Sequence, residues 1–486
     1  MQHALAAAWF VAITGASGVS MAAEGALACF APDQKPAAQV AACTAALSSG
    51  LNAETRILAL LARAEAYVGA GNRAEARRDF DAALRMAPNH PAATLGRARI
   101  NDAEGKAAAA EADFTAVITA LPAQSPEILG EAYTRRGALR LTRGAFDDAA
   151  TDLEHAGGLL PRDLDIRRRL AEARFRGNQP RSAVSVLNGA LGLAPNDVDL
   201  LRMRALAYAQ LRNFGPAVND FTAVLTAKPE DQVSLEGRGV AALQNGTYGR
   251  ALADFARLAD LRPGDARVLF LRGNANLQGG HMDDAVADFT TVLKMKPGDE
   301  ESLFGRATAH MFRGDYTGAE TDLGAILAKT PSAAQALARR GHVRFLRQAF
   351  KEASADFTQA LALPNAPADL LLWRFVAGAR GGDKNAAKAL ADGFQARQQA
   401  DSWPATVAQY FLEKMTGDDL IKAARNTQGR LCEAYFYLGQ AALVQKEPEA
   451  AAKLFTAARS TGMTRFVEYA VSMAELARLN PRPPAK

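Results

Sequence analysis

Residues 198–231, VDLLRMRALAYAQLRNFGPAVNDFTAVLTAKPED, are followed by residues 232–265, QVSLEGRGVAALQNGTYGRALADFARLADLRPGD. The two stretches have the same length of 34 residues and place small, bulky and proline residues at the same points. Ala217 and Ala251 are each the twentieth residue of their stretch, and each has Phe four places later. This pattern indicates an internal repeat.

The repeat extends through most of the chain. Except for one interval of 39 residues between Ala110 and Ala149, the Ala of position 20 recurs every 34 residues, at Ala76, Ala110, Ala149, Ala183, Ala217, Ala251, Ala285, Ala319 and Ala353. Position 8 is always Ala or Gly, position 24 is always Phe or Leu, and position 32 is Pro in the first eight units. Small residues let two helices approach, a bulky residue fills the gap beside them, and Pro ends the second helix. Each unit is therefore expected to be an antiparallel helix pair.

This pattern resembles the tetratricopeptide repeat, whose signature is a small residue at position 8, Ala at 20, an aromatic at 24 and Pro at 32. The resemblance implies an all-α fold, a right-handed superhelical solenoid of helix-turn-helix repeats. Nine units are expected, at residues 57–90, 91–124, 130–163, 164–197, 198–231, 232–265, 266–299, 300–333 and 334–367. A repeat array carries one continuous core along its length, so 486 residues need no division into globular domains.

Positions 7 and 23 carry a second regularity, an Arg followed sixteen residues later by an Asp. The pairs are Arg63 and Asp79, Arg97 and Asp113, Arg136 and Asp152, Arg204 and Asp220, Arg238 and Asp254, Arg272 and Asp288, Arg306 and Asp322, and Arg340 and Asp356. The fourth unit has Leu170 and Val186 instead, so both charges are lost together. This joint loss favours structural ion pairs within each unit, with a functional role for the Arg residues as the alternative.

The first residues read as a targeting segment. An apolar stretch from Ala4 to Val19 is followed by Ser20-Met21-Ala22, which predicts a signal peptide at residues 1–22 and a periplasmic protein. Residues 26–29, ALAC, loosely resemble a lipobox, although Glu24 interrupts the apolar run. The alternative is therefore an outer-membrane lipoprotein, with membrane association only if Cys29 is lipidated.

Cysteine usage agrees with export. Cys29 and Cys43 lie close together, and Cys432 is the single other cysteine. In an oxidising compartment the first two are expected to form a disulfide within an N-terminal cap at residues 23–56. The alternative is a pair of unpaired buried thiols. Cys432 is expected to be a buried apolar residue.

Beyond Pro364 the period decays. Residues 368–431 read as degenerate helical repeats, residues 432–465 as a last unit, and residues 466–486 as a capping helix with a disordered tail. The tail resembles the C-terminal half of the envelope lipoprotein NlpI family, through Trp373, Trp403, YFLEKM at 410–415, FYLG at 436–439, FVEY at 466–469 and Glu475-Leu476. The resemblance implies a non-catalytic envelope adaptor whose partners are a processing protease and peptidoglycan hydrolases.

Motifs for catalysis or cofactors are missing from the sequence. The six His residues show no HExxH motif or paired metal spacing, and no glycine-rich phosphate loop is present. A ligand role for His310 or His342 and a nucleophilic role for Cys432 are the alternatives considered. We therefore predict no enzyme, no cofactor and no metal.

Partner binding is expected on the face built from positions 2, 5, 6, 9, 12 and 13 of the first helices. The candidate groove residues are Arg135, Arg168, Arg169, Arg202, Arg267, Phe270, Asn274, Phe304, Phe312, Arg339 and Phe345. They suggest a basic stretch and an apolar stretch that hold an extended peptide or helix. The alternative is that the aromatics pack between units and the Arg residues form a solvated face.

The charge balance argues against nucleic acid, because a net charge of +5 is mild for 486 residues and acids alternate with bases. The expected function is a periplasmic scaffold for protein or peptide partners. The alternative is a structural component of cell-wall or polysaccharide export machinery, and an enzyme ranks behind both. A further alternative partner is a second copy of the chain, in a homodimer.

Overall fold

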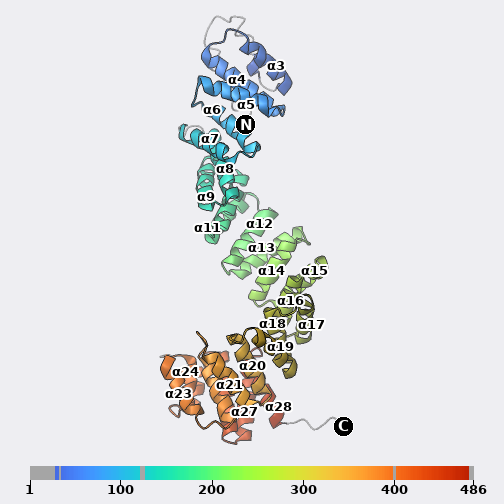
Figure 1. The fold of residues 1–486 in the computed structure, drawn as a ribbon, viewed down its shortest axis with the longest axis vertical. Coiled ribbons are helices and arrows are strands. Elements are labelled where there is room, and N and C mark those ends of the chain that lie inside the picture. The colour runs from blue at the N-terminus through green and yellow to red at the C-terminus, as the bar shows by residue number, and fades with distance from the viewer. Residues whose placement is uncertain (1–27, 32–33, 121–125, 398–400, 481–486) are drawn as a thin grey trace. The chain divides into compact units, whose positions relative to one another are not determined.

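A computed structural model describes residues 28–31, 34–120, 126–397 and 401–480 of the chain. The predicted signal peptide at residues 1–22 and the end of the predicted tail, from residue 481, lie outside these residues. Within them the chain forms helices and no strand (Figure 1). None of the described helices combines the length and the apolar character needed to cross a bilayer.

The chain divides into two compact bodies, Met1–Pro229 and Glu230–Lys486. The helices of the N-terminal body are α3 (Pro36–Leu47), α4 (Ala53–Gly69), α5 (Arg73–Met86), α6 (Pro91–Ala103), α7 (Ala107–Ala120), α8 (Pro126–Arg143), α9 (Phe146–Leu159), α10 (Leu164–Arg176), α11 (Pro180–Leu193), α12 (Val198–Gln210) and α13 (Phe214–Ala227). We call the first helix of each repeat the lead helix and the other its second helix, so α4 is a lead helix and α5 its second helix.

The C-terminal body continues the alternation and then departs from it. Its helices are α14 (Gln232–Gln244), α15 (Tyr248–Leu261), α16 (Ala266–Gly279), α17 (Met282–Met295), α18 (Glu300–Arg313), α19 (Tyr316–Lys329), α20 (Ala334–Leu346), α21 (Phe350–Leu361), α22 (Asp369–Arg380), α23 (Ala386–Arg397), α24 (Trp403–Phe411), α25 (Gly417–Ala424), α26 (Gln428–Val444), α27 (Pro448–Ser460) and α28 (Val467–Leu479). Consecutive helices pack against each other in both bodies. The predicted all-α solenoid is confirmed.

The small residue at position 8 is explained by its neighbour. A Cβ atom added to Gly239 would lie 2.7 Å from the ring of Phe255, the bulky residue of position 24 in the same unit. The same Cβ atom at Gly439 would lie 2.5 Å from the Phe455 ring. Both Phe side chains are fully buried. The ring therefore needs the space that glycine leaves, and the spacing of positions 8 and 24 is a packing requirement.

The turns between units are closed by side-chain caps. Asp197 is the N-cap of α12, and its carboxylate accepts hydrogen bonds of 3.0 Å from the backbone N–H groups of Asp199 and Leu200. Asp163 and Asp265 cap α10 and α16 in the same way. These aspartates come two residues after the Pro of position 32. Pro ends one helix and Asp starts the next, which gives each unit a defined length.

Each Arg of position 7 forms a bidentate ion pair with the Asp of position 23 in its own unit. Arg306 is representative: its Nε and Nη2 atoms donate to the two carboxylate oxygens of Asp322 at 2.8 and 2.7 Å. All eight Asp side chains are buried. In the fourth unit Leu170 and Val186 pack into one apolar cluster at the same place. The pairs therefore join each lead helix to its second helix.

At the N-terminal end, Cys29 and Cys43 form a disulfide with an S–S distance of 2.07 Å. Both cysteines are fully buried and pack with Ala46 of α3 and Ala59 of α4. The bond ties the segment around residue 29 to α3, which covers the apolar face of α4. An end helix of a repeat array has a neighbour on one side only, so a covalent link there compensates for missing contacts.

We expect Cys29→Ser to weaken this end of the array by about 3 kcal/mol, the loop-closure value for a short disulfide loop. Amide hydrogen exchange should become faster in α3 and stay unchanged in α10 and α11. A reducing agent should produce the same change in the wild-type protein and none in the variant. Equal protection of α3 in both proteins would contradict a stabilising role for the bond.

Candidate functional site

In the N-terminal body, the Arg residues predicted to line a basic groove are all paired with acids. Arg135 donates to Glu131 at 2.7 Å and Arg169 to Asp165 at 2.7 Å. Two further pairs are Arg168 with Asp197 at 3.0 Å and Arg202 with Asp199 at 2.5 Å. The prediction of a basic stretch is therefore corrected to a surface of ion pairs, because each positive charge has a nearby carboxylate.

Arg99 is the centre of a related network on the same lead helices. Its Nε donates to Glu131 of α8 at 2.7 Å, and its Nη1 donates to Glu65 of α4 at 3.1 Å. Burial raises the pKa of Glu131, but the hydrogen bonds from Arg99 and Arg135 outweigh it and leave that pKa lowered. Ion pairs on this face therefore connect neighbouring units, so the charged side chains of the face also stabilise the stacking of the repeats.

In the C-terminal body, the predicted apolar groove is largely covered. Phe345 is fully buried, with its ring 5.1 Å from that of Phe350 and 5.4 Å from that of Trp373, so its prediction as a groove residue is wrong. Phe304 and Phe312 are partly buried against the same core. The guanidinium carbon of Arg339 lies 5.5 Å from the Phe304 ring centre. These residues serve packing because the C-terminal helix returns to this place.

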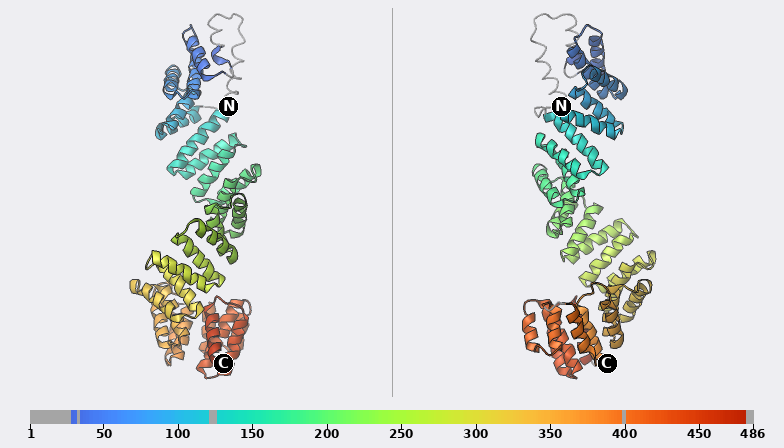
Figure 2. Two further views of the ribbon diagram at one scale, coloured as in Figure 1. Left: turned by 90° about the vertical axis from the view of Figure 1, so that its right-hand side faces the viewer. Right: turned by 60° about the vertical axis from the view of Figure 1, so that its left-hand side comes forward.

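That return is the feature which the repeat pattern did not predict. Arg478 of α28 donates a hydrogen bond to the backbone carbonyl of Leu346, 132 residues earlier in the chain. The Arg465 guanidinium lies 4.3 Å from the ring centre of Tyr248 in α15. Figure 2 shows the last helices, drawn in red, beside the earlier helices of the same body. The segment after α27 therefore packs against units six and nine.

A polar cluster of partly buried side chains around the buried Trp373, which we call the Glu468 cluster, lies where α28 meets α20, α22 and α26. Its members are Arg339, Trp373, Glu433 and Glu468. The indole N–H of Trp373 donates to Glu468 at 3.2 Å, and that of Trp403 donates to Glu433 at 2.6 Å. Burial raises the pKa of Glu468 to about 8, and the charges of Glu433 and Asp369 act in the same direction. The cluster therefore favours a protonated Glu468.

A different part of the predicted groove is open. On the lead helices α14 and α16, Arg267 pairs with Glu236 at 2.9 Å while its side chain stays 70 % exposed. Val233 is three residues before Glu236 and is 50 % exposed. Phe270 and Asn274 lie on the same helix face as Arg267 and are partly buried. We call these five residues the α14–α16 surface.

Two of these five residues were missed by sequence reasoning. Val233 and Glu236 occupy positions 2 and 5 of the sixth unit, which are the positions of Arg267 and Phe270 in the seventh. The repeat register could have identified them, because positions 2 and 5 were used to choose residues in the seventh unit. The same two positions in the sixth unit are Val233 and Glu236.

Cys432, His310 and His342 are the side chains with an alternative chemical role. Within the described part of the chain, no group of three or more His, Cys, Asp or Glu is arranged to hold a metal ion. Burial raises the pKa of the Cys432 thiol to about 11, so a thiolate is disfavoured. Burial lowers the pKa of His310, which contacts Asp315 at 2.8 Å, and lowers that of His342 further. We therefore interpret Cys432, His310 and His342 as structural residues.

Helix pairs that stack on one another along the chain define a helical repeat scaffold. A family model described as tetratricopeptide repeat matches residues 61–125, 168–232, 202–266, 237–300, 304–369 and 432–464. The chain therefore belongs to the tetratricopeptide repeat family. Such repeats form scaffolds for protein–protein interaction, and the fold is typically non-catalytic.

Solved structures of other repeat proteins are similar to parts of the chain. A tetratricopeptide repeat protein from Parabacteroides merdae is 20 % identical, with 51 % of this chain and 97 % of that chain covered and a TM-score of 0.39. The C-terminal part of a repeat protein from Cytophaga hutchinsonii is 17 % identical, with 50 % and 98 % covered and a TM-score of 0.41. YrrB, described as having an unusual peptide-binding site, is 18 % identical, with 38 % and 95 % covered and a TM-score of 0.35. A comparison with curated proteins finds no match.

Proposed function

We propose that this protein is a non-catalytic periplasmic scaffold that binds protein partners through the α14–α16 surface. The observation that carries the proposal is the half-exposed Val233 beside the exposed Arg267 and its partner Glu236. An exposed apolar side chain next to a charged pair matches the centre and rim of a protein interface. The pair of Arg267 and Glu236 also joins units six and seven, whereas Val233 takes no part in the closure of its unit by positions 7, 8, 20, 23 and 24.

The disulfide supports the periplasmic part of the proposal. Disulfides persist in oxidising compartments, and the bond between Cys29 and Cys43 closes the N-terminal end. It also bears on lipidation, since a sulfur atom in a disulfide cannot carry a lipid thioether. The bonded form of Cys29 therefore favours a protein without a lipid anchor over an outer-membrane lipoprotein.

The resemblance of the tail to the NlpI family supports a choice of partners. The residues that carry it include Trp373 and Phe436, whose ring centres lie 4.9 Å apart in the core of the C-terminal body. The residues behind the resemblance are therefore core residues of this tail, which supports the proposal that the tail has the architecture, and with it the adaptor role, of that family. Envelope proteases and peptidoglycan hydrolases are accordingly the partners we propose.

Affinity purification from the periplasm with quantitative mass spectrometry tests this function. We compare the wild-type protein with Val233→Asp and Arg267→Glu, which should each reduce recovery of specific partners at least tenfold. Met295→Asp is the matched control, because Met295 is 42 % exposed at the end of the second helix α17, outside the surface.

The identity of the recovered proteins separates the two candidate functions. A protease or peptidoglycan hydrolase supports the adaptor, whereas a glycan synthase or outer-membrane porin supports the export machinery. Equal recovery with all three variants would overturn the assignment of the α14–α16 surface.

A further inference from the structure

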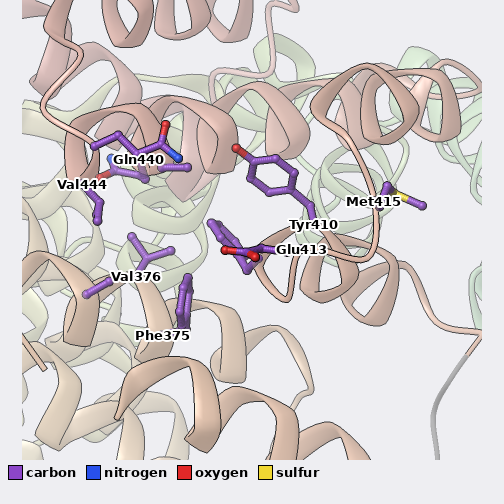
Figure 3. Close-up of a pocket in the computed structure, with 11 residues that line it drawn as sticks. Phe375, Val376, Tyr410, Glu413, Met415, Gln440 and Val444 are labelled. Atoms are coloured by element: carbon purple, nitrogen blue, oxygen red, sulfur yellow. The ribbon is translucent and has the colours of Figure 1, made fainter. Parts of the chain in front are cut away.

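A pocket of about 370 Å³ opens at the C-terminal ends of three lead helices, α22, α24 and α26. Its walls are mainly apolar and aromatic: Phe375, Val376, Tyr410, Phe411, Met415 and Val444. In Figure 3, Gln440 and Val444 lie opposite Phe375 and Val376, with Tyr410 and Glu413 to one side. Glu413, Gln440 and Gln445 add polar groups to this lining, so the pocket has an apolar part and a polar part, as ligand pockets usually do.

Gln440 gives this pocket a defined hydrogen-bond donor. Its side-chain oxygen accepts a hydrogen bond of 2.6 Å from Arg380 Nη1, which determines which end of the amide is oxygen. Arg380 is in turn held by Glu475 at 3.2 Å. The amide nitrogen is therefore turned away from Arg380. It is buried and has no hydrogen-bond partner among the described residues.

An unsatisfied buried N–H group is costly, and a carbonyl oxygen is the neutral acceptor that would satisfy it. Gln440 lines the pocket, so the missing acceptor can come from a molecule bound there. The apolar walls provide the rest of the binding energy for an apolar group. Together they fit a group that joins a large apolar side chain to a carbonyl, which is the composition of a peptide residue.

The rim of the pocket adds a preference for charge. Glu413 is exposed and is the acidic residue among those lining the pocket, none of which is Lys, Arg or His. The C-terminal ends of α24 and α26 lie at the same rim and carry partial negative charge. The exposed Lys414 and Lys446 are close in sequence but are not among the lining residues. A positive charge beside the apolar group is therefore favoured.

We propose that this pocket binds an extended peptide through one large apolar residue, whose backbone carbonyl accepts a hydrogen bond from the Gln440 amide nitrogen, and through an adjacent basic residue that pairs with Glu413. The inference rests on the proposed scaffold function and names the chemistry of a second contact with the partner. It is separate from the α14–α16 surface, because the two sites share no residue.

The test uses three synthetic peptides and saturation-transfer NMR with the full-length protein. Ac-Ala-Lys-Phe-Ala-NH2 is the probe, Ac-Ala-Lys-Ala-Ala-NH2 lacks the apolar anchor, and Ac-Ala-Glu-Phe-Ala-NH2 reverses the charge. We expect saturation transfer to the Phe ring of the first peptide, none to the second, and at least threefold weaker binding of the third.

Two variants test the residues themselves. Gln440→Met keeps the length of the side chain and removes the donor, so the affinity for the first peptide should fall about fivefold, the effect of one hydrogen bond. Val444→Arg places a long cation at the rim, where Val444 is 45 % exposed and tolerant of substitution, and should abolish binding. Met295→Arg is the matched control, with the same cation on an exposed apolar site elsewhere in the C-terminal body.

The outcomes separate this proposal from the proposed function. Absence of saturation transfer, or unchanged binding by both variants, overturns the pocket as a peptide site. Loss of partner recovery with Val233→Asp, alongside a pocket that binds no peptide, would leave the scaffold function standing without this second contact. If the pocket binds the peptide but Val233→Asp and Arg267→Glu leave partner recovery unchanged, the pocket stands as a peptide site and the α14–α16 surface is overturned as a partner-binding site.

Discussion

We expect Arg306→Leu to lower the free energy of unfolding by roughly 3 to 5 kcal/mol, the cost of leaving one member of a buried ion pair unpaired. The side chain of Asp322 is 5 % exposed and that of Arg306 is 22 % exposed. Both carboxylate oxygens of Asp322 accept hydrogen bonds from Arg306. Without the Arg, a negative charge would remain buried between α18 and α19 without its partner.

The double variant Arg306→Leu with Asp322→Val should recover most of this loss and lie within about 1 kcal/mol of the wild type, because a buried ion pair is often replaced by apolar residues at little cost. The fourth unit is the natural precedent: Leu170 and Val186 occupy these positions and pack together. The double variant transfers that solution to the eighth unit.

Urea unfolding followed by circular dichroism, with hydrogen exchange to locate the change, measures these differences. Hydrogen exchange is needed because a long repeat array does not unfold in one step. Arg257→Leu is the matched control: its partner Glu230 is 61 % exposed, so the loss should stay below about 1 kcal/mol. Equal losses in the single and double variants would contradict the ion pair as the source of the effect.

The second large effect concerns pH. Burial raises the pKa of Glu468 to about 8 from an ordinary value of 4.5, so the folded protein keeps this proton to higher pH than the unfolded chain. Stability should therefore fall as the pH rises from about 4.5 to about 8 and level off above that range. At about 1.4 kcal/mol per pKa unit, the difference between a pKa of 4.5 and one of about 8 corresponds to a loss of at most about 5 kcal/mol for the C-terminal body.

The charged and polar groups around Glu468 add to or oppose the effect of burial on its pKa. Asp369 of α22 and Glu433 of α26 add negative charge, and burial raises their pKa values too. Arg339 of α20 is the opposing positive group, and burial lowers its pKa. The Trp373 indole N–H acts in the opposite direction to burial by stabilising the Glu468 carboxylate. Desolvation is the largest influence, so protonation is favoured.

Glu468→Gln should remove most of this pH dependence, because glutamine is neutral throughout and its side-chain oxygen can accept the Trp373 hydrogen bond. The variant should be close to the wild type near pH 5 and more stable than it at pH 8.5. Thermal unfolding at a series of pH values measures this, with Glu352→Gln on the exposed side of α21 as the control. An unchanged slope would show that the Glu468 carboxyl group is solvated in the folded protein.

Sequence reasoning reached the repeat architecture because the interactions that build a unit are local. Gly239 and Phe255 are 16 residues apart, as are Arg306 and Asp322, so each helix pair repeats the same contacts and the period shows them directly. The groove residues were harder to predict. Position in the repeat says which face a side chain occupies, but not what else covers that face.

The charges of the N-terminal body illustrate this difference. Arg168 lies at a groove position, yet its partner Asp197 is the last residue of the unit and caps α12, the lead helix of the next unit. Pairing of this kind depends on the rotation between neighbouring units, which the period does not specify. A sequence pattern could count the acids and bases on the face but not decide which of them pair.

By itself, the amino-acid sequence determined the fold family, the helix pairs and the ion pair within each unit, because those features follow from contacts a few turns apart. Only the tertiary structure decided the return of α28, which brings Glu468 to Trp373 across 95 residues of chain, and the pocket where α22, α24 and α26 meet. Contacts between distant segments leave no period, since each forms once and depends on how all the intervening helices stack.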